Sequence, residues 1–71
     1  MRGDCLARGM TLYYFLCRMG YPVTLEFGVG DVGGRIEGHC WLVMDGEPIL
    51  ESRDPRGVFR EIFSIPAAPP A

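Results

Sequence analysis

The sequence lacks any excess of positive charge. It contains no lysine, and its seven basic residues, all arginine, are offset by nine acidic residues to give a net charge of -2. The arginines are scattered along the chain, so no basic stripe is present to bind phosphate groups. We therefore expect no nucleic-acid partner.

Long apolar runs and paired cysteines are also missing. The longest apolar run, residues 10–17, is far shorter than the roughly 20 residues of a membrane span. Residues 1–4 lack the charged and apolar regions of a secretory signal. Three cysteines without a CxxC pair do not form a disulfide framework and suit a reducing compartment. We expect a cytoplasmic protein that has no membrane partner.

The overall composition is that of a globular protein. Of 71 residues, 48% are hydrophobic, 11% aromatic and 23% charged, which is typical of a folded chain. A chain this short forms one domain and buries roughly 60% of its unfolded surface, so its stability is expected to be marginal. We assign the domain to residues 1–65 and expect the proline-rich and alanine-rich residues 66–71 to form a disordered tail.

A helix is predicted at residues 5–19. The segment has no proline, follows Asp4 as a candidate N-cap, and precedes Gly20, which can end a helix in the left-handed conformation. Almost all its sides are apolar or small, which indicates a helix packed on most of its surface. We expect it to be the central helix.

After the helix the chain is predicted to form strands joined by loops. Residues 23–27 alternate apolar with polar side chains and predict the first strand. Residues 28–35 carry four glycines and predict a mobile hairpin loop; they lack the following helix and the Lys-Ser/Thr pair of a phosphate loop. Further strands are predicted at residues 37–44, 47–51 and 58–65, the last at an edge. The expected fold is α+β, with the helix packed on an antiparallel sheet of three to four strands.

Cys5 lies where a thiolate is favoured. The unpaired N–H groups and the dipole at the start of a helix attract negative charge, and they can also stabilise an oxyanion. A nucleophile that attacks a carbonyl is therefore one interpretation, and a small buried hydrophobe is the other. We expect Cys17, near the other end of the helix, to fill the core.

His39, the single histidine, is the candidate general base. Its strand is expected to cross next to the start of the helix, beside Cys5. A purely structural histidine is an alternative, and so is a zinc site with Cys5 and Cys40. Cys40 should point to the opposite face of the strand, which disfavours a shared metal. We expect neither a metal nor a cofactor.

The residue that could orient His39, as the third member of a catalytic triad, depends on the turn before residue 47. A two-residue turn of residues 45–46 sets His39 opposite Ser52, whereas a three-residue turn of residues 44–46 sets it opposite Glu51. A carboxylate there would fix the tautomer of the imidazole and stabilise the imidazolium. We predict the three-residue turn.

That register has further consequences. It places His39, Trp41 and Val43 on one face together with Ile49. Trp41 would then either shield the imidazole from water or pack against the helix. Asp54 is a rival for the third position, although its proline-containing loop suggests an Asx turn.

Three segments together resemble a known family. They are Cys5-Leu6-Ala7-Arg8-Gly9, Gly38-His39-Cys40-Trp41 and residues 45–51. They resemble the transglutaminase-like leader peptidases of lasso-peptide biosynthesis, over Cys5 to about Phe63. In that family a cysteine opens a helix of the form C-L-x-R, H-A-W or H-C-W follows on a strand, and an acidic residue comes later. Glu51 stands where the family usually has aspartate.

The resemblance implies a transglutaminase or papain-like core and cleavage of a precursor peptide at its leader–core junction. Cys5 would be the nucleophile, His39 the base and Glu51 the orienting acid. It also implies a leader-binding recognition protein and an ATP-dependent cyclase as partners. Relatives carry upstream helices, so we expect a truncated core. A non-catalytic peptide-binding module or inactive fragment, and acyl transfer to an amine, are the alternatives.

Overall fold

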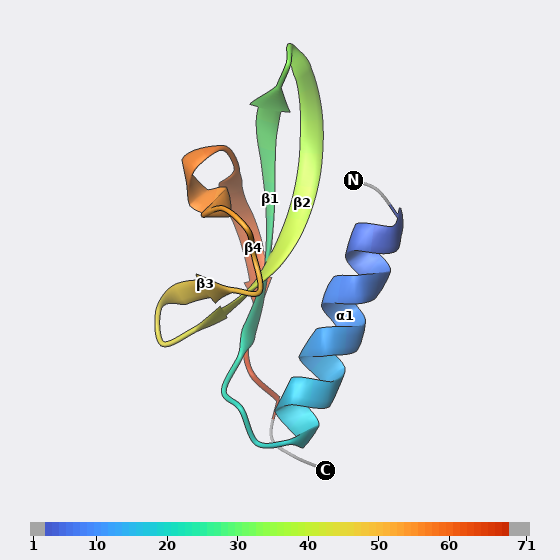
Figure 1. Ribbon diagram of the computed structural model, residues 1–71, viewed down its shortest axis with the longest axis vertical. Coiled ribbons are helices and arrows are strands. Elements are labelled where there is room, and N and C mark those ends of the chain that lie inside the picture. The colour runs from blue at the N-terminus through green and yellow to red at the C-terminus, as the bar shows by residue number, and fades with distance from the viewer. Residues whose placement is uncertain (1–2, 69–71) are drawn as a thin grey trace.

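The computed structural model describes residues 3–68 and has an α+β fold (Figure 1). One helix packs on a four-stranded antiparallel sheet whose strand order is β3-β2-β1-β4. The predicted class is confirmed. The elements are α1 (Gly3–Arg18), β1 (Thr24–Val32), β2 (Arg35–Met44), β3 (Glu47–Ile49), the 3-10 helix η1 (Pro55–Gly57) and β4 (Arg60–Ile65).

The start of α1 differs from the prediction. The helix includes Gly3, so Asp4 lies in its first turn rather than at the N-cap, and its carboxylate accepts a hydrogen bond from the Cys5 N–H at 3.0 Å. The end is as expected, because Gly20 has a φ of 92°. The N–H groups of Gly20 and Tyr21 donate to the carbonyls of Cys17 and Leu16, both at 3.0 Å. This pair of bonds is the Schellman motif.

The core lies between α1 and one face of the sheet. It contains Cys17 from α1, Val23 before β1, Leu25 and Phe27 from β1, and Cys40 and Leu42 from β2. On the other side of the helix, Met10, Tyr14 and Phe15 are each at least half exposed. The prediction of a helix packed on most of its surface is therefore wrong for residues 3–68, because the sheet covers only one side. Within these residues, no helix has the length and apolarity needed to cross a bilayer.

The loop predicted at residues 28–35 is mostly strand. β1 continues to Val32 and β2 begins at Arg35, so only Gly33 and Gly34 form the turn, with φ values of 62° and 80°. Positive φ at both positions is the geometry of a two-residue hairpin turn whose twist matches the strands. The carboxylate of Asp31 accepts the N–H of Gly34 at 2.9 Å.

The earlier glycines of that loop allow close packing. A Cβ atom on Gly28 would lie 2.7 Å from the backbone oxygen of Arg60 and 2.7 Å from the ring of Trp41. A Cβ on Gly30 would collide with the backbone oxygen of Val58. Glycine here serves close approach of the chain before and within β4, not flexibility.

β4 is an edge strand, as predicted, and pairs with β1. Phe63 stacks on Phe27 at 4.5 Å between ring centroids. Of the predicted tail, residues 66–68 are exposed, and the Tyr13 hydroxyl donates to the backbone oxygen of Pro66. Residues 69–71 lie outside the described part of the chain.

The predicted three-residue turn between β2 and β3 is wrong. Met44 pairs with Glu47, so the turn has two residues, Asp45 and Gly46, with φ values of 55° and 78°. Ile49 consequently pairs with Leu42 and packs against the core, not on the face of His39. An Asp-Gly pair accommodates positive φ at both positions, so the tighter turn forms without strain.

Candidate active site

Cys5 lies in the first turn of α1, beside β2. Its Sγ is 3.3 Å from Nδ1 of His39 and 3.9 Å from the backbone oxygen of Cys40. Both partners belong to β2, so the start of the helix and this strand meet at the thiol. The contact between Cys5 and His39 that the sequence predicted is present.

Gly9 lets the helix come this close. A Cβ atom on Gly9 would lie only 2.8 Å from Sγ of Cys40, so a larger residue would push α1 away from β2. Glycine inside a helix costs roughly 0.5–1 kcal/mol relative to alanine. Here the cost is offset by the approach that brings Cys5 to His39.

His39 is held at both ring nitrogens. Nδ1 faces Cys5, and Nε2 lies 2.8 Å from a carboxylate oxygen of Glu51. The two side chains of this contact are 25% and 16% exposed, so water screens them only in part. With Nε2–H donating to Glu51, Nδ1 of the neutral ring is left to accept a proton from the thiol.

Aromatic rings fix the plane of the imidazole. Trp41 stacks at 5.9 Å and Phe59 lies at 5.1 Å between ring centroids. Trp41 is 1% exposed and lies outside the core cluster under α1, so it packs beside His39 rather than against the helix. Its indole N–H is buried and has no hydrogen-bond partner among residues 3–68. Phe59 was missed, because it lies between η1 and β4 with no periodic signal.

Glu51 reaches His39 by a route that the predicted register did not contain. β3 ends at Ile49, and Leu50 has a φ of 59°, in the left-handed region. The chain turns there and leaves the ladder, so neither Glu51 nor Ser52 is a cross-strand partner of His39. The predicted contact between carboxylate and imidazole exists, but a turn at Leu50 makes it.

Asp54, the rival acid, is engaged elsewhere. Its carboxylate accepts the backbone N–H of Arg56 at 2.9 Å, the predicted Asx turn, and also binds the guanidinium of Arg56. These hydrogen bonds lower the pKa of Asp54 and raise the pKa of Arg56. Arg56 also pairs with Glu47 at 3.0 Å. The cluster braces the loop before β4 against the β2–β3 turn.

Cys40 lies next to Cys5, the candidate nucleophile, but is more deeply buried. Its Sγ lies 4.0 Å from Sγ of Cys5, and its thiol donates to the backbone oxygen of Cys5 at 3.4 Å. Burial, and then the charge of Cys5, raise the pKa of Cys40 to about 11. Cys40 therefore stays a neutral thiol at physiological pH. Cys17 is buried in the core, as expected, and no group of three side chains in residues 3–68 is arranged to hold a metal ion.

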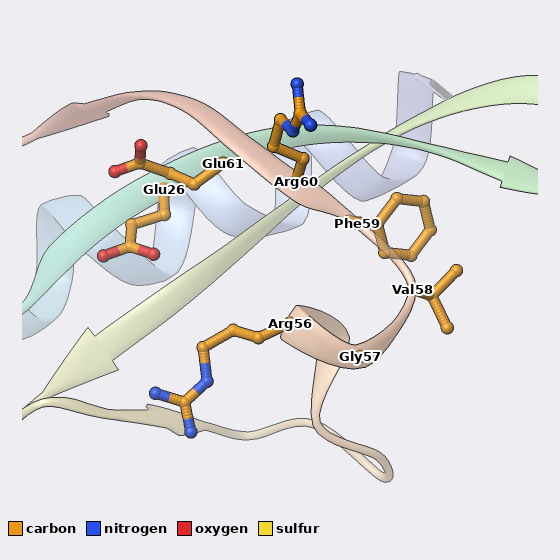
Figure 2. Close-up of a pocket in the computed structure, with 7 residues that line it drawn as sticks. All are labelled: Glu26, Arg56, Gly57, Val58, Phe59, Arg60 and Glu61. Atoms are coloured by element: carbon orange, nitrogen blue, oxygen red, sulfur yellow. The ribbon is translucent and has the colours of Figure 1, made fainter.

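A small cavity opens beside the thiol. It has a volume of about 190 Å³ and is lined by Cys5, Val32, Glu37, Gly38, His39 and Phe59. A larger hollow of about 480 Å³ is lined by Glu26 and residues 56–61, and Figure 2 shows its side chains spread around the chain that leads into β4. The larger hollow contains none of Cys5, His39 and Glu51, so the smaller one is the candidate substrate site.

Comparison with known proteins identifies the family. The family model of the transglutaminase-like superfamily matches residues 1–64, which includes all three candidate site residues. No curated protein and no solved structure matches the chain. Because the match covers nearly the whole sequence, the chain belongs to the transglutaminase-like superfamily.

Proposed function

We propose that this protein is a cysteine peptidase with Cys5 as nucleophile, His39 as general base and Glu51 as the residue that orients the histidine. The observation that carries the proposal is the continuous contact from Sγ through both nitrogens of the imidazole to a carboxylate, at 3.3 Å and 2.8 Å. Nucleophile, base and orienting acid in this order define a triad by geometry. Membership of the superfamily is consistent with this chemistry.

The reaction follows from the positions of the groups. Nδ1 of His39 takes the proton of the Cys5 thiol, and Glu51 stabilises the imidazolium that results. The thiolate adds to the peptide carbonyl, and the positive end of the α1 dipole stabilises the oxyanion. The C–N bond then breaks as the imidazolium protonates the leaving amine. His39 next removes a proton from water, which attacks the thioester and releases the acid and the thiol.

The substrate that we propose is the precursor of a lasso peptide, cut between leader and core. The support is the likeness of the segments around Cys5, His39 and Glu51 to the leader peptidases of that pathway. A leader-binding protein would deliver the precursor, and an ATP-dependent cyclase would act on the released core. Three free thiols in the described chain fit a reducing compartment, so we place the reaction in the cytoplasm.

The first test is the rate at which iodoacetamide alkylates Cys5 as a function of pH. The background carries Cys17→Ser and Cys40→Ser, so that a single thiol reports. We expect the rate at pH 6–8 to fall at least tenfold in His39→Ala, and the profile to move to higher pH. Profiles that coincide with and without His39 would refute the thiol–imidazole pair.

The second test is cleavage of the precursor peptide, mixed with the leader-binding protein and followed by mass spectrometry. Cys5→Ala should abolish cleavage. An acyl fragment whose mass corresponds to a free carboxylic acid indicates hydrolysis. An acyl fragment whose mass corresponds to an amide of an added amine indicates acyl transfer. Absence of cleavage by the parent protein, together with peptide binding that is unchanged in Cys5→Ala, would favour the non-catalytic binding module.

A further inference from the structure

One edge of β2 is open next to the candidate nucleophile. β3 pairs only with Leu42–Met44, so residues 35–41 have no strand partner on that side within residues 3–68. Figure 1 shows the β1–β2 hairpin extending well beyond β3 at this end. Ile36, in this stretch, is 78% exposed. Unpaired backbone groups on a sheet edge are a template for another extended chain.

The two hairpin turns determine which backbone groups face this edge. Each turn has two residues, so the residues on either side of it, Val32 with Arg35 and Met44 with Glu47, form hydrogen-bonded pairs. Because the direction of the backbone groups alternates along a strand, the two turns predict the same set of outward-facing groups in β2. The N–H and C=O groups of residues 35, 37, 39 and 41 point to β1, whereas those of Ile36, Gly38 and Cys40 point to the open edge.

The thiol of Cys5 lies next to the position that a strand added to this edge would occupy. Its Sγ is 3.9 Å from the backbone oxygen of Cys40, one of the groups that point to the edge. A neighbouring strand lies about 4.8 Å from β2, so a chain paired with Gly38 and Ile36 would meet Sγ as it passes Cys40. The edge therefore leads directly to the thiol.

We infer that the peptide substrate binds as an extended strand on the open edge of β2. Its backbone bonds to Ile36 and Gly38, and this pairing carries the scissile carbonyl to Sγ of Cys5. Side chains of the bound strand alternate between the two faces, so one beside the scissile bond enters the 190 Å³ cavity lined by Glu37 and Phe59. This inference rests on the proposed peptidase function and specifies how its substrate is held.

The test uses peptides that alkylate Cys5, because no substrate sequence is needed. The probes are acetyl-trialanine chloromethyl ketone, which resembles the acyl side of a substrate, and chloroacetyl-trialanine amide, which resembles the leaving side. Their rates are divided by the rate with iodoacetamide, in the background with Cys17→Ser and Cys40→Ser. We expect at least one probe to show a preference over iodoacetamide, and that probe identifies the side that binds the edge.

Two changes remove single backbone hydrogen bonds. Ile36→Pro deletes an N–H that faces outward, a position where a strand tolerates proline, and Ile36→Ala is the matched control that keeps the N–H. The preference should fall about two- to tenfold further in Ile36→Pro than in Ile36→Ala, which retains the backbone donor. On the probe, N-methylation should reduce the preference at alternate residues only, because alternate amides face β2.

The inference is overturned if the preference is the same for Ile36→Pro and Ile36→Ala and insensitive to N-methylation at every position. It is also overturned if neither probe is preferred. In those cases alkylation by iodoacetamide that still depends on His39 would leave the proposed chemistry standing. If Ile36→Pro does not fold, the methylated probes decide, since they leave the protein unchanged.

Discussion

Replacement of Glu51 by glutamine isolates the contribution of one charge to the candidate site. The amide keeps nearly the shape of the carboxylate and can still accept the Nε2–H bond that now spans 2.8 Å. It cannot stabilise an imidazolium by charge. Thiolate formation at Cys5, which places the proton on His39, should therefore become less favourable in Glu51→Gln.

The size of the effect follows from the burial of the pair. Hydrogen bonds to charged groups contribute roughly 1.5–3 kcal/mol, and side chains only 25% and 16% exposed are weakly screened. The amide keeps a neutral hydrogen bond worth roughly 0.5–1.5 kcal/mol, so the ion-pair state loses about 1–1.5 kcal/mol. This corresponds to a drop of about five- to tenfold in reactivity, at about 1.4 kcal/mol for each factor of ten.

The assay is iodoacetamide alkylation at pH 7 in the background that retains only Cys5. Glu47→Gln is the control, because it removes the same charge from a side chain that is 74% exposed and paired with Arg56. We expect the control to react as fast as the parent within twofold. Equal rates for Glu51→Gln and Glu47→Gln would show that the Glu51 carboxylate does not support thiolate formation.

Three further predictions concern the structure around the site. Gly30→Ala should lower the free energy of unfolding by about 1–3 kcal/mol in a urea titration, because its Cβ would collide with the backbone oxygen of Val58; Gly57→Ala, whose Cβ has open space, should not. Leu50→Val, a β-branched residue at a φ of 59°, should slow Cys5 alkylation as Glu51→Gln does, whereas Leu50→Gly should preserve the rate; equal rates would contradict the turn at Leu50 as the source of the contact. Burial raises the pKa of Cys40 from 9.0 to about 11, so the unfolded chain ionises first and the free energy of unfolding should fall as the pH rises between these values. This fall should be missing in Cys40→Ser, and parallel stability curves would refute it.

The order of helix and strands was predictable because it depends on local sequence. The capping glycine at Gly20, the alternation in residues 23–27 and the Asp45-Gly46 signal each act within a few residues. The contact of Cys5 with His39 was also anticipated, since a helix start and an adjacent strand meet in a small helix-on-sheet fold. The contact of His39 with Glu51 was anticipated from a three-residue turn that the structure does not contain. The catalytic use of these contacts is still a proposal.

The sequence did not reveal where glycine means flexibility and where it means close contact. Gly28 and Gly30 were assigned to a mobile loop, but they are strand residues that leave space for β4. Gly9 was not singled out, although it sets the distance between α1 and β2. Each of these roles depends on an atom far away in the sequence, which no local pattern contains.

By itself, the sequence determined the fold class and the residues that could form a thiol, imidazole and carboxylate chain, because residue types and short-range periodicity are written in it. Only the tertiary structure decided how the carboxylate arrives. The turn after β2 closed with two residues, and the left-handed Leu50 then brought Glu51 to His39. A one-residue change in a turn reverses every side chain beyond it, so such a contact depends on packing across the whole sheet rather than on spacing along the chain.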